Sequence, residues 1–214
     1  MIEYSYQLKL NKKSLYVIQQ GSKTLGVLPR AKLRMFLNFQ EELEIDETNF
    51  LSFQEELIRY GRERLFKFLT YRERSLKEVR QFLKVLPLAS EYAKELVTFC
   101  LEKNFQNDKR FTEMFVMSAK DNRVSMREIR HKLKEKGISD QMIESAIGEF
   151  YPKLEERNNL KELADYAYRR YRCDDARKHR TKSMEYLIRK GYDYYDAKGE
   201  IDKLFTGSDD DFEF

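Results

Sequence analysis

A repeat with a period of about fifty residues constrains the fold of this 214-residue chain more than any other feature. Residues 72–83 align with residues 122–133, and both contain the pattern Ser-x-x-Glu-(Val/Ile)-Arg-x-x-Leu. The Ser and Glu of this pattern are typical of a capping box, in which both side chains satisfy free N–H groups at a helix start. Residues 133–138 (LKEKGI) recur as residues 187–192 (LIRKGY), and Lys-Gly before an apolar residue is typical of a helix C-terminus. The repeat therefore predicts three similar helical units.

The apolar residues between these motifs recur at helical spacing, which predicts three helices in each unit. In the second unit the three apolar sets lie within residues 111–119, 126–133 and 142–150. Such spacing is far more typical of a bundle core than of a cofactor site. Ahead of the first unit, Asp46 is the predicted N-cap of a helix that runs through residues 50–69.

The N-terminal residues show a different periodicity. Residues 2–10 alternate apolar and polar side chains, which predicts a strand with one buried face. Residues 11–14 have the composition of a turn, and residues 15–20 that of a returning strand. We therefore expect a small β-hairpin or three-stranded sheet. Because an isolated hairpin is marginal in water, it must pack against another part of the chain.

These patterns predict an all-α fold of tandem three-helix repeats that form an elongated, curved chain, with a small N-terminal β-hairpin or sheet. The predicted parts follow one another along the sequence. They are a β-hairpin region (1–29), linking helices (30–57), repeat 1 (58–104), repeat 2 (105–153), repeat 3 (154–205) and an acidic tail (206–214).

The charge distribution bears on the kind of partner. Lys and Arg number 41 against 37 Asp and Glu, a net charge of +4 that becomes +8 when the four acids of residues 208–214 are left out. A basic body favours a polyanion or an acidic protein surface as partner. We expect the tail to be disordered, because it cannot bury enough apolar area. It resembles the acidic, Phe-terminated tail of bacterial single-strand DNA-binding proteins, and both autoinhibition or docking and a merely solubilising role stay open.

The residue inventory argues against an enzyme. Only two His and two Cys occur, without metal-ligand or catalytic spacing, and no phosphate-binding glycine motif is present. We therefore expect no catalytic residue, no metal and no cofactor. No stretch approaches the roughly 18 apolar residues that span a bilayer, and the expected location is cytoplasmic.

At the level of short motifs the chain resembles the RecX family of bacterial regulatory proteins. The family's signature between its first two repeats has its counterpart in residues 105–111 (FQNDKRF), and its repeat endings in residues 129–138 and 187–194. The first repeat is matched by Leu69, Arg72, Ser75, Glu78, Val79 and Leu83. The resemblance covers roughly residues 58–204. Two departures are Ser125, where the family usually has glycine, and Leu86-Pro87, which replaces the Lys-Gly of the first repeat.

The resemblance implies a cytoplasmic, non-enzymatic protein that binds the RecA filament on single-stranded DNA. Such a protein modulates, most often inhibits, homologous recombination, DNA repair and the SOS response. The alternative is a sequence-tolerant, helical DNA-binding module that acts without RecA. In either case we expect a monomer.

Recurring basic side chains are the candidate contacts to partner or DNA. For any single one of them a solvated position paired with one of the many Glu side chains is favoured, whereas their recurrence in three units indicates that some form a continuous stripe. The candidates are Arg72, Arg74, Lys77, Arg80, Arg123, Arg127, Arg130, Lys134, Arg177, Lys178, Arg180, Lys182 and Arg189. Residues 166–172 also interleave Tyr with Arg, a composition that can stack on bases, although helical spacing assigns part of it to the core.

Overall fold

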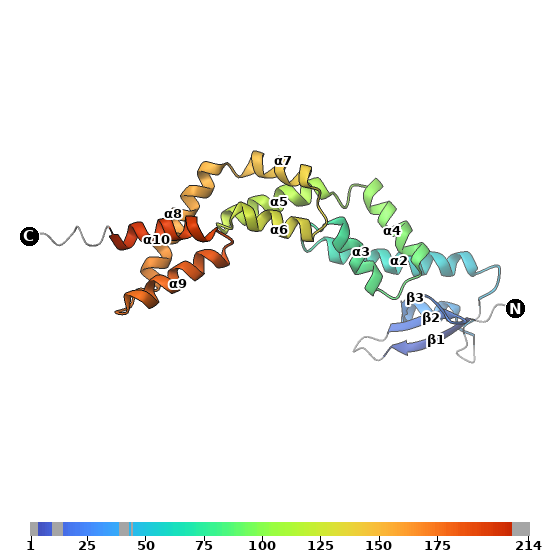
Figure 1. The fold of residues 1–214 in the computed structure, drawn as a ribbon. Helices are drawn as coiled ribbons and strands as arrows, with labels where there is room; N and C mark the ends of the chain where they lie inside the picture. The colour runs from blue at the N-terminus through green and yellow to red at the C-terminus, as the bar shows by residue number, and fades with distance from the viewer. Residues whose placement is uncertain (1–3, 10–14, 39–42, 44, 207–214) are drawn as a thin grey trace, which may run out of the picture. The chain divides into compact units, whose positions relative to one another are not determined.

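A computed structural model describes residues 4–9, 15–38, 43 and 45–206, so the predicted turn at 11–14 and nearly all of the acidic tail lie outside the described residues. The chain divides into two compact units, Met1–Asn107 and Asp108–Phe214 (Figure 1). Each unit is described by itself below. The elongated, curved arrangement of the repeats stays a prediction.

Unit 1 begins with an antiparallel sheet of three strands in the order β1 (Tyr4–Lys9), β2 (Leu15–Gln20) and β3 (Lys23–Pro29). Gly21 makes the turn between β2 and β3 with a left-handed φ of 57°, which glycine adopts without steric cost. The prediction of a small N-terminal sheet is therefore confirmed.

The sheet packs on helix α2 (Phe50–Leu69). This packing provides the buried apolar contacts that a small sheet needs to be stable. Ile18 and Leu28 share one apolar core with Phe53 and Leu57. Gly26 permits the close approach, since a Cβ there would lie 2.8 Å from Leu57 Cδ2. The short helix α1 (Arg30–Leu33) and the 3-10 turn η1 (Arg34–Phe36) complete this core.

Helix α2 is followed by α3 (Leu76–Val85) and α4 (Ser90–Glu102), and the three helices surround a second core. Its buried members are Leu65, Val79, Leu83, Leu96 and Cys100. Helix α2 is continuous across residues 57 and 58, where the sequence predicted a boundary between linking helices and repeat 1. The domain boundaries themselves stay predictions.

The predicted N-cap of α2 is wrong. The cap position is held by Asn49, and Asp46 lies one turn earlier, where its carboxylate accepts the backbone N–H groups of Thr48 and Asn49 at 2.9 and 3.0 Å. Aspartate makes such turns as readily as it caps helices, and composition alone does not separate the two.

Unit 2 consists of two three-helix bundles. The first contains α5 (Asp108–Asp121), α6 (Met126–Glu135) and α7 (Asp140–Phe150). The second contains α8 (Lys153–Arg170), α9 (Ala176–Arg189) and α10 (Tyr194–Thr206). Ile129 and Leu133 lie in the core of the first bundle, and Leu163, Leu187 and Ile201 in that of the second. The mostly helical fold of three-helix units is confirmed.

The two predicted capping boxes differ. At α3, Ser75 Oγ accepts the N–H of Glu78 and the Glu78 carboxylate accepts the N–H of Ser75, so the box is complete. At α6, Ser125 Oγ accepts the N–H of Glu128, but the N–H of Ser125 donates instead to the carbonyl oxygen of Lys190 at 3.0 Å. The second box is therefore only half formed, because the N–H of Ser125 is bonded to Lys190 of the following bundle and not to the Glu128 carboxylate.

Candidate partner-binding groove

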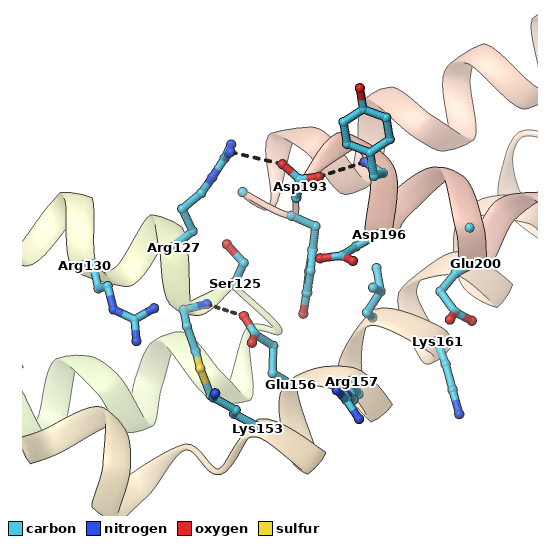
Figure 2. Close-up of a pocket in the computed structure, with 16 residues that line it drawn as sticks. Ser125, Arg127, Arg130, Lys153, Glu156, Arg157, Lys161, Asp193, Asp196 and Glu200 are labelled. Carbon is cyan, nitrogen blue, oxygen red and sulfur yellow. Dashed lines mark hydrogen bonds and ion pairs between the residues drawn. The ribbon is translucent and has the colours of Figure 1, made fainter. Parts of the chain in front are cut away.

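A groove of about 800 Å³ lies in unit 2 between α6, the first half of α8 and the start of α10 (Figure 2). Its walls carry mainly charged side chains, with the apolar Met126 and Leu160 and the aromatic Tyr192 and Tyr195 among them. The charged residues are Arg127, Arg130, Lys153, Glu156, Arg157, Lys161, Asp193, Asp196 and Glu200.

Hydrogen bonds between the two bundles hold the walls of the groove together. Met126, in the first turn of α6, donates its N–H to Glu156 Oε1 of α8 at 2.6 Å. A dashed line at the labelled Glu156 marks this bond in Figure 2. Lys190 Nζ donates to the carbonyl oxygen of Asn122 at 2.9 Å. The Tyr192 hydroxyl donates to the carbonyl oxygen of Arg123 at 3.3 Å, and burial raises the pKa of Tyr192 far above its usual range, which keeps this donor protonated.

The Lys190-Gly191 helix end predicted from the sequence makes this approach possible. Gly191 has a φ of +90°, and a Cβ there would collide with Glu128 Cβ and lie 2.7 Å from Ser125 Oγ. Gly137 ends α6 with a φ of +80° in the same way. In unit 1, where Leu86 replaces the Lys of this motif, the residue after α3 is extended instead.

Basic side chains on α8 form one wall of the groove. Lys153, Arg157 and Lys161 recur every fourth residue, so they lie on one face of the helix, spaced about 6 Å apart along its axis. All three are exposed, and none has an ion pair within the described part of the chain. The first half of α8 therefore presents a row of three cations that make no direct ion pair among the described residues, beside the Glu156 carboxylate in the same groove.

The carboxylates of the groove are mostly engaged. Asp193 Oδ2 lies 3.7 Å from Arg127 Nη1, and its Oδ1 accepts the N–H of Tyr195 (Figure 2). Glu200 pairs with Lys203 outside the groove at 2.6 Å, and Glu156 accepts the backbone donor described above. The groove thus carries five cationic and four carboxylate side chains, and the three cations of α8 are not ion-paired with any of these carboxylates.

The candidate residues of unit 1 do not gather at such a site. Arg72 pairs with Glu78 at 2.8 Å. The Arg74 guanidinium lies 4.0 Å from the centre of the Phe68 ring, and burial lowers the pKa of Arg74. Lys77 and Arg80 are exposed on α3.

In the first bundle of unit 2 the candidate side chains are paired with carboxylates. Arg123 pairs with Glu162 at 2.7 Å, and Lys134 with Asp140 at 2.9 Å. Arg130 makes two hydrogen bonds to Glu144, at 2.7 and 2.9 Å, and these hold the pKa of Glu144 below its usual range.

In the second bundle the candidates are a mixture. Three of them pair with carboxylates: Lys178 with Asp175, Arg180 with Asp202, and Arg189 with Glu185. Arg177 and Lys182 are exposed on α9.

Of the thirteen candidates the structure thus brings Arg127 and Arg130 to the groove, where they join three residues that the sequence analysis did not single out. The recurrence of Lys153, Arg157 and Lys161 at every fourth position was a usable signal, because it marks one face of a helix. Contact with a partner stays a prediction for all of these residues.

The fold and the groove define a class of protein, a tandem three-helix repeat protein with a groove lined by charged side chains. Among the described residues no group of side chains could hold a metal ion, and no helix there is long and apolar enough to cross a membrane. Residues 107–147 match the family model described as "RecX, second three-helix domain".

Curated relatives and solved structures carry the same name. Regulatory protein RecX of Streptococcus uberis is 31% identical over 141 residues, which cover 63% of this chain and 52% of the relative. That of Oceanobacillus iheyensis is 29% identical over 148 residues, 69% of this chain and 54% of the relative. The crystal structure of RecX from Lactobacillus salivarius matches 70% of this chain and 97% of its own, with a TM-score of 0.55 and 26% identity.

A second crystal structure, titled regulatory protein RecX, covers 94% of this chain and 100% of its own with a TM-score of 0.58; at 20% identity it supports the fold alone. Over much of its length this chain is therefore similar to regulatory proteins of the RecX family. The match spans about half the length of these curated relatives.

Proposed function

We propose that this protein binds the RecA filament assembled on single-stranded DNA. Bound there, it modulates the recombinase in DNA repair and the SOS response, and the proposed direction is inhibition. The similarity to RecX regulatory proteins supports this proposal. The structural observation that carries it is the row of Lys153, Arg157 and Lys161 along the groove, because these cations have no carboxylate partner within the described residues.

The proposed mechanism needs no catalytic residue. A protein that contacts successive protomers of a filament changes the free energy of adding or losing a subunit, because it binds the assembled state and not the free protomer. Tandem helical units present an extended surface suited to such contacts. The row on α8, with Arg127 and Arg130 beside it, would hold acidic side chains of a protomer or phosphates of the DNA. We further propose that the protein acts as a cytoplasmic monomer.

The direct test is RecA-catalysed ATP hydrolysis on single-stranded DNA with this protein added below the RecA concentration. We expect the intact protein to reduce hydrolysis. The triple variant Lys153→Ala, Arg157→Ala, Lys161→Ala should require at least about tenfold more protein for the same effect, since a charge-assisted contact contributes roughly 1.5–3 kcal/mol.

A matched control removes the same charge elsewhere. Lys84, Lys94 and Lys103 are exposed on or just after the helices of unit 1, and none has an ion pair among the described residues. Changing these three to Ala should leave the inhibition nearly unchanged. A second set, Arg127→Ala, Arg130→Ala and Lys134→Ala, tests side chains that the structure pairs with carboxylates.

Salt dependence then identifies the anionic groups. If the row contacts DNA phosphates, the slope of log affinity against log salt should fall by about 0.7 for each contact removed from a single strand. If it contacts a protein surface, the slope should change less. An intact protein that leaves hydrolysis unchanged, but holds DNA tightly without RecA, would overturn the proposal in favour of a DNA-binding module.

A further inference from the structure

A second hollow, of about 620 Å³, lies on another face of α8, near its C-terminal half. At 100° per residue, its α8 residues 162, 166, 169 and 170 lie on a different side of the helix from the row of residues 153, 157 and 161. The lining residues are Arg123, Glu162, Leu163, Asp165, Tyr166, Arg169, Arg170 and Tyr186. This hollow has a composition unlike that of the groove, because tyrosine and arginine dominate it.

The two tyrosine rings of the hollow lie together, and the ring of Tyr171, which is not part of the lining, lies beside that of Tyr186. The centres of the Tyr166 and Tyr186 rings are 5.6 Å apart, and those of Tyr171 and Tyr186 are 6.0 Å apart, with the rings tilted at 45° and 55°. Tyr166 is 45% exposed, although Ala164 and Ala167 on the neighbouring face of α8 are buried. Core packing therefore does not account for Tyr166, whose ring remains available to a planar ligand.

Arginine side chains surround these rings. Arg170 donates a hydrogen bond to the Tyr166 hydroxyl at 2.6 Å, and its guanidinium lies 5.7 and 5.8 Å from the centres of the Tyr166 and Tyr171 rings. Arg169 is exposed and has no ion pair among the residues that the structure describes. Arg123 pairs with Glu162, and Asp165 is the second carboxylate of the lining. Planar rings and guanidinium groups that share one hollow suit a ligand with both flat apolar faces and negative charge.

We propose that this hollow binds one or two unpaired nucleobases of a single nucleic-acid strand. A base stacks on the exposed ring of Tyr166, and Arg169 and Arg170 meet the flanking phosphates. Bases within a duplex present no free face, so a duplex would use only the charges. An acidic peptide would likewise use the arginines and leave the rings without a role. The site is independent of RecA and goes beyond the function proposed above.

The absence of Trp from the chain gives a direct readout. Tyr166→Trp keeps a stacking surface and introduces a single indole, whose fluorescence should be quenched when a 20-nucleotide thymidine strand binds. An abasic strand of equal length has the same phosphates without bases, and it should bind more weakly and leave the fluorescence nearly unchanged. A uridine strand of the same length shows whether DNA or RNA is the better source of the bases.

Substitutions then separate stacking from charge in the otherwise unchanged full-length protein. Tyr166→Leu should weaken binding of the thymidine strand roughly tenfold, the order expected for one stacked base, and should hardly affect the abasic strand. Arg170→Gln should weaken both. Tyr71→Leu, which changes an exposed tyrosine of unit 1, serves as the control. Circular dichroism checks that each variant is folded.

Equal affinity for the thymidine and abasic strands, together with no effect of Tyr166→Leu, would overturn the proposal. So would the absence of any binding to either strand. Because RecA is absent from every one of these measurements, such a result leaves the test of filament regulation untouched.

Discussion

At the scale of the single residue, Gly191 shows how a sequence motif acquires a second role in the fold. The Lys-Gly pattern requires a left-handed residue at the end of α9, and the φ of +90° agrees. The structure adds a reason that the pattern does not contain: Ser125 and Glu128 of the preceding bundle occupy the space that a Cβ on residue 191 would need. Any side chain at this position meets both a backbone and a packing penalty.

Gly191→Ala should therefore lower the free energy of unfolding by about 2–5 kcal/mol, the sum of left-handed strain and overpacking. Gly148 is the matched control, because it lies inside α7 and a Cβ added there would meet no other atom within 4 Å. Gly148→Ala should raise stability by about 0.5–1 kcal/mol. Urea unfolding followed by circular dichroism measures both. Equal effects of the two substitutions would show that the junction does not constrain Gly191.

Glu144 gives a prediction about pH. Its two hydrogen bonds from Arg130 hold its pKa below the ordinary value of 4.5. A carboxylate with a lowered pKa contributes stability above its unfolded pKa and loses it as pH falls through the folded pKa. We expect the titration midpoint of Glu144, measured by carboxyl carbon NMR, to lie below 4.5 and to move up in Arg130→Gln. A midpoint that is the same in both proteins would contradict the pairing.

At the scale of the element, the sequence predicted the helices better than their ends. Periodicity located the three-helix units and the strands, because an element with one buried face has apolar residues at regular spacing in the sequence. It assigned two complete capping boxes, whereas only that of Ser75 is complete. The N–H of Ser125 bonds to Lys190, and no local pattern could reveal a partner sixty-five positions away.

The two helix starts therefore predict different responses to the same change. Glu78→Ala removes the return bond to Ser75 and the ion pair with Arg72, and should cost about 1 kcal/mol of unfolding free energy. Glu128→Ala removes the ion pair with Lys132 but no return bond to Ser125, and it keeps the Cβ that packs against Gly191, so it should cost less than about 0.5 kcal/mol. Urea midpoints of the two variants provide the comparison. A larger loss in Glu128→Ala than in Glu78→Ala would argue against the half-formed box.

The candidate site was predicted less well than the fold. Charge and repetition pointed to Arg127 and Arg130, which do line the groove, but passed over Lys153, Arg157 and Lys161 on α8. Whether a cation is available to bind a partner depends on whether a carboxylate of the same protein pairs with it. That pairing depends on how neighbouring helices pack. In a chain with 37 acidic residues, sequence alone does not tell a paired arginine from an unpaired one.

At the scale of the whole molecule, the described residues of each unit form two apolar cores. In unit 2 the two bundles keep separate cores, and polar bonds and close backbone packing join them at Ser125, Met126 and Gly191. The two repeats of unit 2 are therefore not independent modules. Residues of the following bundle supply the hydrogen-bond acceptors for the first N–H groups of α6.

The junction also changes how fast particular protons leave the protein. The first N–H groups of a helix normally have no backbone partner and exchange quickly with solvent. Here the amide of Ser125 is held by the carbonyl oxygen of Lys190, and that of Met126 by the Glu156 carboxylate. Both amides should exchange with deuterium slowly, at rates set by the opening of the second bundle. Glu156→Gln should speed the exchange of Met126 first, so one amide becomes a local reporter of whether neighbouring repeats stay attached.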